Sequence, residues 1–218
     1  LRNHDRCSWT LGRSAPHGPN PLMTALRGLG LMGHGASTKY VPGVYLWNTA
    51  DVRLAVLQGL LDTDGTILAH SNSVSFTSIS SQLAEDVVFL VRSLGGLAVT
   101  RERVTTYTYR GERKQGQVSY HVSVRLPNGT PPFRLSRKMA RVKIKGIRNR
   151  PARYIVGADP MGEGPSACIK VDHPSGLFVI HDFIVTHNTT GGAAAFQSHA
   201  EPLSKVTPEL LPLRIAVI

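Results

Sequence analysis

The stretch Leu57-Gln58-Gly59-Leu60-Leu61-Asp62-Thr63-Asp64-Gly65 decides our interpretation of the fold, because an apolar helix ends here in two acidic residues. Thr49 predicts the N-cap of this helix, which we expect from Ala50 to about Leu61. The small Gly59 allows a similar helix to pack backbone-close, which would bring the acidic residues of two helix ends together. Gly65 predicts a left-handed turn that closes the helix.

Two carboxylates at one point are good ligands for Mg²⁺, and a divalent ion beside DNA phosphates supports hydrolysis of the phosphodiester bond. An isolated Asp-x-Asp-Gly is also consistent with a buried helix whose charged end is capped by glycine. The neighbouring elements are therefore needed to choose between a catalytic and a purely structural role.

Helices and β-hairpins alternate around the acidic stretch. Cap residues, apolar periodicity and turn residues predict each of them. In chain order we expect a helix from Pro21 to about Leu31 capped by Asn20, the acidic helix, a hairpin of Thr66–Ala69 and Ser73–Thr77, a helix from Ser81 to Leu94 capped by Ser80, a hairpin of Leu97–Thr108 and Gly116–Leu126 joined by a loop at Arg110–Lys114, and a short helix within Pro131–Met139.

The acidic stretch resembles the LAGLIDADG, or dodecapeptide, homing endonucleases through Leu57, Gly59, Leu60, Asp62, Asp64 and Gly65. This resemblance implies that Asp64 holds the catalytic Mg²⁺, whereas Asp62 mainly shapes the helix end. It also implies that the hairpins form a saddle on the major groove of double-stranded DNA. The contact residues expected on these strands are Arg101, Arg103, Arg110, Arg113, Lys114 and Arg125.

Upstream of the helix, the segment from Ser37 to Pro42 resembles the one that precedes the second such motif in intein-borne endonucleases. The resemblance implies that Lys39 lies in the active site, where it would stabilise charge on the phosphate or position water. A solvated loop lysine is the alternative.

Composition agrees with a nucleic-acid partner. The chain of 218 residues has a formal net charge of +11, and its basic residues cluster between Arg101 and Arg153. A basic soluble protein with no such partner is the alternative. Cys7 and Cys168 are too few for a disulfide framework, so we expect a reducing, cytoplasmic location. No stretch approaches the ~18 to 20 apolar residues of a membrane span.

A second informative stretch is Val185-Thr186-His187-Asn188-Thr189. The side-chain amide of Asn188 can attack its own carbonyl, provided that His187 gives a proton to the scissile nitrogen. The hydroxyl of Thr189 can carry an acyl group until that cut occurs. A strand end that runs into a turn is the alternative.

Residues 167–188 resemble the C-terminal blocks of an intein. Cys168, together with Thr186 before His-Asn, resembles the subclass called class 3. In that subclass the resemblance implies that Cys168 attacks the upstream splice junction and forms a branched thioester. The acyl group then passes to Thr189.

We therefore expect an α+β chain, in which an αββαββ half-saddle precedes part of an all-β Hint splicing domain. The expected divisions are a linker and the end of a first endonuclease half (1–38), the LAGLIDADG repeat (39–140), the splicing segment (141–188) and a host segment (189–218). The start of the host segment would suit a P-loop ATPase just after its phosphate loop, for example a phage terminase large subunit.

The sequence shows a single acidic motif and no N-terminal splicing half, so we expect a truncated intein. It would need a separate N-terminal half or a homodimer partner to act. One alternative is a free-standing LAGLIDADG endonuclease or RNA maturase in which His-Asn-Thr is coincidental. Another is a catalytically inactive DNA-binding module.

Overall fold

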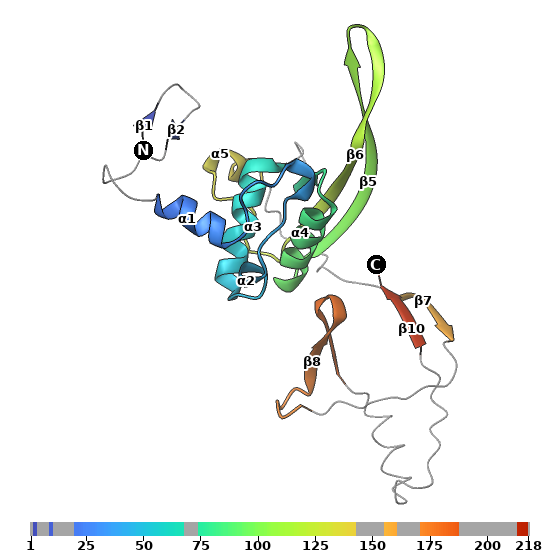
Figure 1. Ribbon diagram of the computed structural model, residues 1–218. Helices are drawn as coiled ribbons and strands as arrows, with labels where there is room; N and C mark the ends of the chain where they lie inside the picture. The colour runs from blue at the N-terminus through green and yellow to red at the C-terminus, as the bar shows by residue number, and fades with distance from the viewer. Residues whose placement is uncertain are drawn as a thin grey trace, which may run out of the picture.

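The computed structural model describes residues 20–67, 74–142 and 171–187, together with the backbone of four short strands. These strands are β1 (Arg2–Asn3), β2 (Trp9–Thr10), β7 (Ile155–Pro160) and β10 (Leu213–Val217). The predicted helices and strands of the main body occur in the predicted order, and two short helices that were not predicted, η1 and α2, lie before the acidic helix (Figure 1). They are α1 (Pro21–Gly28), η1 (Ala36–Thr38), α2 (Gly43–Leu46), α3 (Ala50–Asp64), β3 (Gly65–Ile67), β4 (Val74–Ser78), α4 (Ser81–Ser93), β5 (Leu97–Tyr109), β6 (Glu112–Arg125) and α5 (Ser136–Met139).

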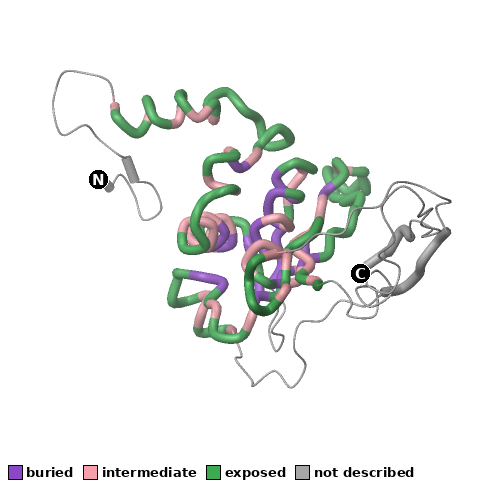
Figure 2. The backbone as a smooth tube through the Cα atoms, turned by 90° about the horizontal axis from the view of Figure 1, so that it is seen from below, coloured by how far each residue is buried: buried purple, intermediate pink, exposed green. Residues whose placement is uncertain are grey.

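Strands β3 to β6 form one antiparallel sheet in the order β3-β4-β6-β5. Helices α3 and α4 pack on it, whereas the distal part of the β5–β6 hairpin extends well beyond the helices (Figure 1). Buried residues gather where these helices meet the sheet, and α1 contributes none of them (Figure 2). The largest fully buried apolar side chains are Phe76, Phe133, Leu57, Leu61, Leu90, Val87, Val91, Val122 and Val124.

The N-caps of α1 and α4 confirm two sequence predictions. The Asn20 side chain accepts a hydrogen bond from the Leu22 amide at 3.0 Å. In the same way, Ser80 Oγ accepts one from the Leu83 amide at 3.1 Å. Thr49 occupies the predicted N-cap position of α3, but its side chain makes no capping hydrogen bond there.

The acidic helix is longer than predicted, because α3 continues through Asp64 and contains both carboxylates. Gly65 does not adopt a left-handed turn: its φ of −79° and ψ of 146° are extended, and it begins β3. Glycine is needed there for a different reason. A Cβ atom at this position would lie 2.4 Å from the carbonyl oxygen of Leu61, so the strand leaves the helix too closely for any side chain.

The turn of the second hairpin is shorter than the predicted loop. Only Arg110 and Gly111 separate the strands, and both have positive φ values, 51° and 83°. A two-residue turn of this kind matches the twist of paired strands. Arg113 and Lys114 therefore belong to β6 and not to a loop. The turn of the first hairpin lies outside the described residues.

The C-terminal region contains a small hairpin of β8 (Leu177–Ile180) and β9 (Ile184–His187), joined by the 3-10 turn η2 (His181–Phe183). Strand β10 pairs antiparallel with β7. The backbone of these two strands thus links the region assigned above to the host with the region assigned to splicing.

Candidate functional site

The first acid of the motif, Asp62, accepts hydrogen bonds from the chain segment that leads into α5. Its carboxylate accepts hydrogen bonds from the amides of Arg134 and Leu135, each at 3.2 Å. The buried Gln58, one turn earlier, donates to the carbonyl of Pro131 at 2.8 Å and accepts from Arg134 Nε at 3.0 Å. These bonds attach the segment to α3, and they suit a structural role for Asp62.

The second acid, Asp64, is exposed at the last position of α3. No hydrogen bond or ion pair joins its carboxylate to another residue within the described parts of the chain. Both of its oxygens are therefore available to a cation from solvent, in contrast to those of Asp62.

Lys138 is a residue of this site that sequence reasoning missed. Its Nζ donates to the carbonyls of Leu61 at 2.9 Å and of Gly65 at 2.6 Å. It thereby places a positive charge at the carboxyl end of α3, where cations are favoured. Only its position at the start of a basic stretch marks it in the sequence, and that signal does not distinguish it from its basic neighbours.

The electrostatics of Lys138 tie it to both acids. Burial lowers its pKa, and the nearby positive charge of Arg137 lowers it further. Asp62 and Asp64 oppose this change, because each negative charge favours the protonated amine. The lysine thus lies in the field of the two carboxylates.

The acidic end fits half of a magnesium site. Mg²⁺ in proteins is commonly held by one or two carboxylates, with waters and phosphates as its other ligands. Asp64 supplies one unpartnered carboxylate. Among the described residues there is no cluster of three or more His, Cys, Asp or Glu side chains.

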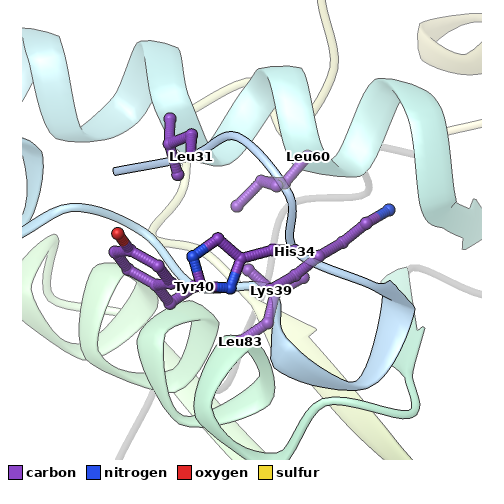
Figure 3. A pocket seen from close by; sticks show the side chains of 6 residues that line it. All are labelled: Leu31, His34, Lys39, Tyr40, Leu60 and Leu83. Carbon is purple, nitrogen blue, oxygen red and sulfur yellow. The ribbon is translucent and has the colours of Figure 1, made fainter. Parts of the chain in front are cut away.

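The segment that carries Lys39 is fastened to α4 by two bonds from its backbone. Ser80 Oγ donates to the Lys39 carbonyl at 2.6 Å, and the Val41 amide donates to the buried carboxylate of Asp86 at 2.7 Å. Lys39 lines a hollow with Leu60 of α3, one turn before Asp64, while its ammonium group points away from the other lining side chains (Figure 3). The structure thus brings Lys39 beside the acidic helix.

One face of the sheet carries the predicted arginines of the strands. Arg101 of β5 lies opposite His121 of β6, and Arg103 lies opposite Ser119. The neighbouring Thr77 hydroxyl is 3.1 Å from His121 Nδ1. Since alternate residues share a face, these side chains lie on the side opposite Val122, which is buried in the core. Arg125 lies four residues after His121 on β6, so its side chain is on the same face.

His121 lies among positive charges on that face. Its pKa is below the usual value, first because of burial and then because of the charges of Arg103 and Arg101. A neutral imidazole can donate or accept a hydrogen bond, and the basic strands around it are suited to phosphate and base edges.

The distal hairpin separates two residues that the sequence analysis had grouped together. Lys114 pairs with Tyr107, and its Nζ lies 5.3 Å from the centre of the Tyr109 ring. Alternation along β5 puts both tyrosines on the side of Arg103. Arg113 instead bonds to Thr106 Oγ1 at 3.2 Å, which places it on the opposite side. Arg113 and Lys114 therefore lie on different sides of the hairpin, and the DNA contact of each remains a prediction.

The predicted splicing residues are only partly within the described residues. Thr186 pairs with Phe178, and the exposed His187 pairs with Leu177 at the end of β9. Cys168, Asn188 and Thr189 lie outside the described residues. The strand before the predicted junction is thus present, and the junction and its reacting groups remain predictions.

Comparison with known families identifies the central part of the chain. Residues 51–125 match the LAGLIDADG-like domain. These residues run from α3 to the end of β6 and include Asp62, Asp64 and the basic strands. The chain therefore contains a LAGLIDADG-like domain, as the acidic motif predicted.

Three curated relatives are all named as DNA helicases. The replicative DNA helicase DnaB of Mycobacterium intracellulare is 32% identical over 175 residues, which cover 78% of this chain and 28% of the relative. DnaB of Rhodothermus marinus is 34% identical over 115 residues, or 50% of this chain and 12% of the relative. The ATP-dependent DNA helicase Hel308 of Thermococcus kodakarensis is 39% identical over 69 residues, or 29% and 6%. This chain thus spans less than a third of each relative.

In the described part of the chain, every helix is too short or too polar to cross a lipid bilayer.

Proposed function

We propose that this chain is part of an intein whose LAGLIDADG-like domain is a DNA homing endonuclease. The carboxylate of Asp64 carries this proposal, because it has no hydrogen-bond or ion-pair partner within the described parts of the chain. It lies at the end of a helix that Asp62 attaches to the segment before α5. LAGLIDADG domains are usually nucleases that use divalent metal ions. The basic face of Arg101 and Arg103 would hold DNA in a position suited to cleavage.

Asp64 is the residue that would hold Mg²⁺, and the ion would supply charge stabilisation at the scissile phosphate. Asp62 keeps the helix end and the segment before α5 in place. Lys138 holds a positive charge beside the two acids, and Lys39 extends another from the α4 side. Each would favour the negative charge that builds up on phosphate oxygens.

A second acid would come from a second LAGLIDADG half, either in the same protein or in another copy. Gly59 is exposed on α3, and a Cβ atom added there would meet nothing within 4 Å. A second helix can approach closely at such an open glycine. Packing there would place the two helix ends side by side, each with its free aspartate.

The endonuclease proposal is tested by selecting cleaved plasmids from a library of randomised target sequences with Mg²⁺. The chain is supplied alone and together with a second LAGLIDADG half. We expect Asp64→Asn to lower the cleavage rate by about a hundredfold or more while DNA binding persists. Glu85→Gln, an exposed change on α4, is the matched control and should cleave normally.

The same experiment can favour the catalytically inactive DNA-binding module. In that case the wild-type chain would bind DNA with a strong dependence on salt and would not cleave it under any of these conditions. Equal cleavage by wild type and Asp64→Asn would also remove the role proposed for this aspartate.

For the C-terminal region we propose a splicing junction at Asn188, with Thr189 as the acceptor and Cys168 as the upstream nucleophile. The hairpin supports this proposal because Leu177, Val179 and Val185 are exposed apolar residues next to the junction. A face of this kind suits coverage by further β-structure, such as the other half of a splicing domain.

The helicase relatives change our proposal for the host. A replicative DNA helicase now replaces the terminase-like ATPase that the sequence alone suggested, because two DnaB proteins match this chain. Residues 189–218 would be the host segment.

Mass spectrometry tests the junction. The purified chain, with and without an N-terminal splicing half, should slowly release a peptide that begins at Thr189, and Asn188→Ala should abolish this release. Asn128→Ala, an exposed asparagine in the loop after β6, is the control. An intact chain under every condition would favour the free-standing endonuclease or maturase instead.

A further inference from the structure

Helix α4 of the LAGLIDADG-like domain contacts the turn of the C-terminal hairpin through an ion pair. Arg92 Nη1 lies 2.7 Å from Asp182 Oδ1, and the exposed fractions of the two side chains are 26% and 42%. A hydrogen-bond length of this kind is typical of a charge-assisted bond. The turn η2, which contains Asp182, leads directly into β9 and His187.

Aromatic side chains reinforce the same contact. The rings of Phe89 on α4 and Phe183 in the turn meet edge to face, with their centres 4.9 Å apart and an angle of 83°. Phe89 also meets the ring of Trp47 in a similar way, with centres 4.9 Å apart and an angle of 74°. Edge-to-face pairs are favourable beyond the area that they bury. Figure 1 shows the hairpin beside the end of α4.

The backbone of the turn supports a specific role for this contact. Asp182 and Phe183 have positive φ values of 61° and 58°, which are uncommon for residues with side chains. Strained residues of this kind persist only where their surroundings hold them. These are the two residues whose side chains meet Arg92 and Phe89, so α4 is what holds the turn.

We propose that α4 is the docking surface for the β8–β9 hairpin, and that Arg92 and Phe89 are positioning residues for the splice junction. Through the turn, the endonuclease domain would set the direction in which β9 carries His187 towards Asn188. The docking itself stands apart from the proposed splicing activity, and only its effect on cleavage rests on that activity.

A charge-swap cycle in the full chain tests the docking. We expect Arg92→Glu and Asp182→Arg each to speed amide hydrogen exchange in residues 177–187 by about fivefold, and the double variant to restore slow exchange. Arg92 also donates to the carbonyl of Ala98 at 3.3 Å, so exchange in α3 serves as the folding control. Glu85→Lys, an exposed change on the same helix, should leave the hairpin unaffected.

The release of the peptide that begins at Thr189 is the second readout. The single variants should slow it, and the charge swap should restore it, which a merely destabilised chain would not show. If exchange follows the cycle but wild type releases no peptide, the docking stands and the splicing function fails. If the swap restores neither exchange nor release, the docking proposal is wrong.

Discussion

The LAGLIDADG-like domain and the C-terminal hairpin are both built on antiparallel strands, but they differ in what covers those strands. In the domain, α3 and α4 bury one face of the sheet, so Val122 and Phe76 are almost fully enclosed. In the hairpin, Val179 and Val185 are each 59% exposed. An isolated two-stranded hairpin is only marginally stable in water. The C-terminal hairpin therefore depends on contacts with other parts of the protein, whereas the LAGLIDADG-like domain has a core of its own.

Core substitutions should show the largest difference between the two regions. Leu57 of α3 is fully buried, so Leu57→Ala should lower the free energy of unfolding by about 2–5 kcal/mol. Val179→Ala should change it by about 0.5 kcal/mol or less. Urea denaturation followed by circular dichroism measures both. A large loss from Val179→Ala would mean that the hairpin belongs to a core of its own.

The next largest effect on stability is expected at Gly65, where β3 leaves the end of α3 in close contact with the helix. In Gly65→Ala the new methyl group would meet the Leu61 carbonyl, so the helix end has to shift, at a cost of about 1–3 kcal/mol. Gly176→Ala, in the turn that precedes β8, is the comparison, since a Cβ atom there would meet nothing within 4 Å but the residue has a φ of +63°. Urea denaturation measures the stability of both. If Gly65→Ala is neutral, the acidic helix end is less rigid than its geometry implies.

The two faces of the sheet should differ in their effect on DNA binding. Arg101→Ala should weaken DNA binding about fivefold and reduce the salt dependence by about one charge, because it removes a cation from the proposed DNA face. Arg113→Ala, on the opposite side of the hairpin, should change affinity much less. Fluorescence anisotropy at several salt concentrations measures both constants. The reverse order would place DNA on the other face.

The smallest predicted effect is the pH dependence that His121 gives to DNA affinity and to the free energy of unfolding. Its lowered pKa means that the free protein binds this proton only at acidic pH, whereas nearby phosphates would favour the charged ring. DNA affinity should therefore rise a few-fold as the pH falls below ~6.5. The free energy of unfolding should move the other way, falling over the same range because the unfolded chain binds the proton more readily. His121→Gln should remove both trends in anisotropy and denaturation series.

Sequence reasoning worked best where one local rule decides the structure. Asn20 and Ser80 cap their helices as predicted, because a side-chain oxygen next to free amides is a local matter. It failed at Gly65, where the cause is a contact with the preceding helix and not a turn conformation. It also placed Arg113 and Lys114 in a loop, because the length of the turn, and hence the face of each residue, depends on strand pairing.

The sequence by itself determined the acidic helix, its two aspartates, the order of helices and hairpins and the basic strands, because periodicity, caps and residue chemistry are local properties. Only the tertiary structure decided that Asp62 accepts hydrogen bonds while Asp64 has no such partner among the described residues. It also decided that Lys138 reaches the helix end and that Arg92 forms an ion pair with the turn before His187. Each of these contacts joins residues that are far apart in the chain. The packing of α3, α4 and the sheet brings them together, and the local sequence around each residue does not.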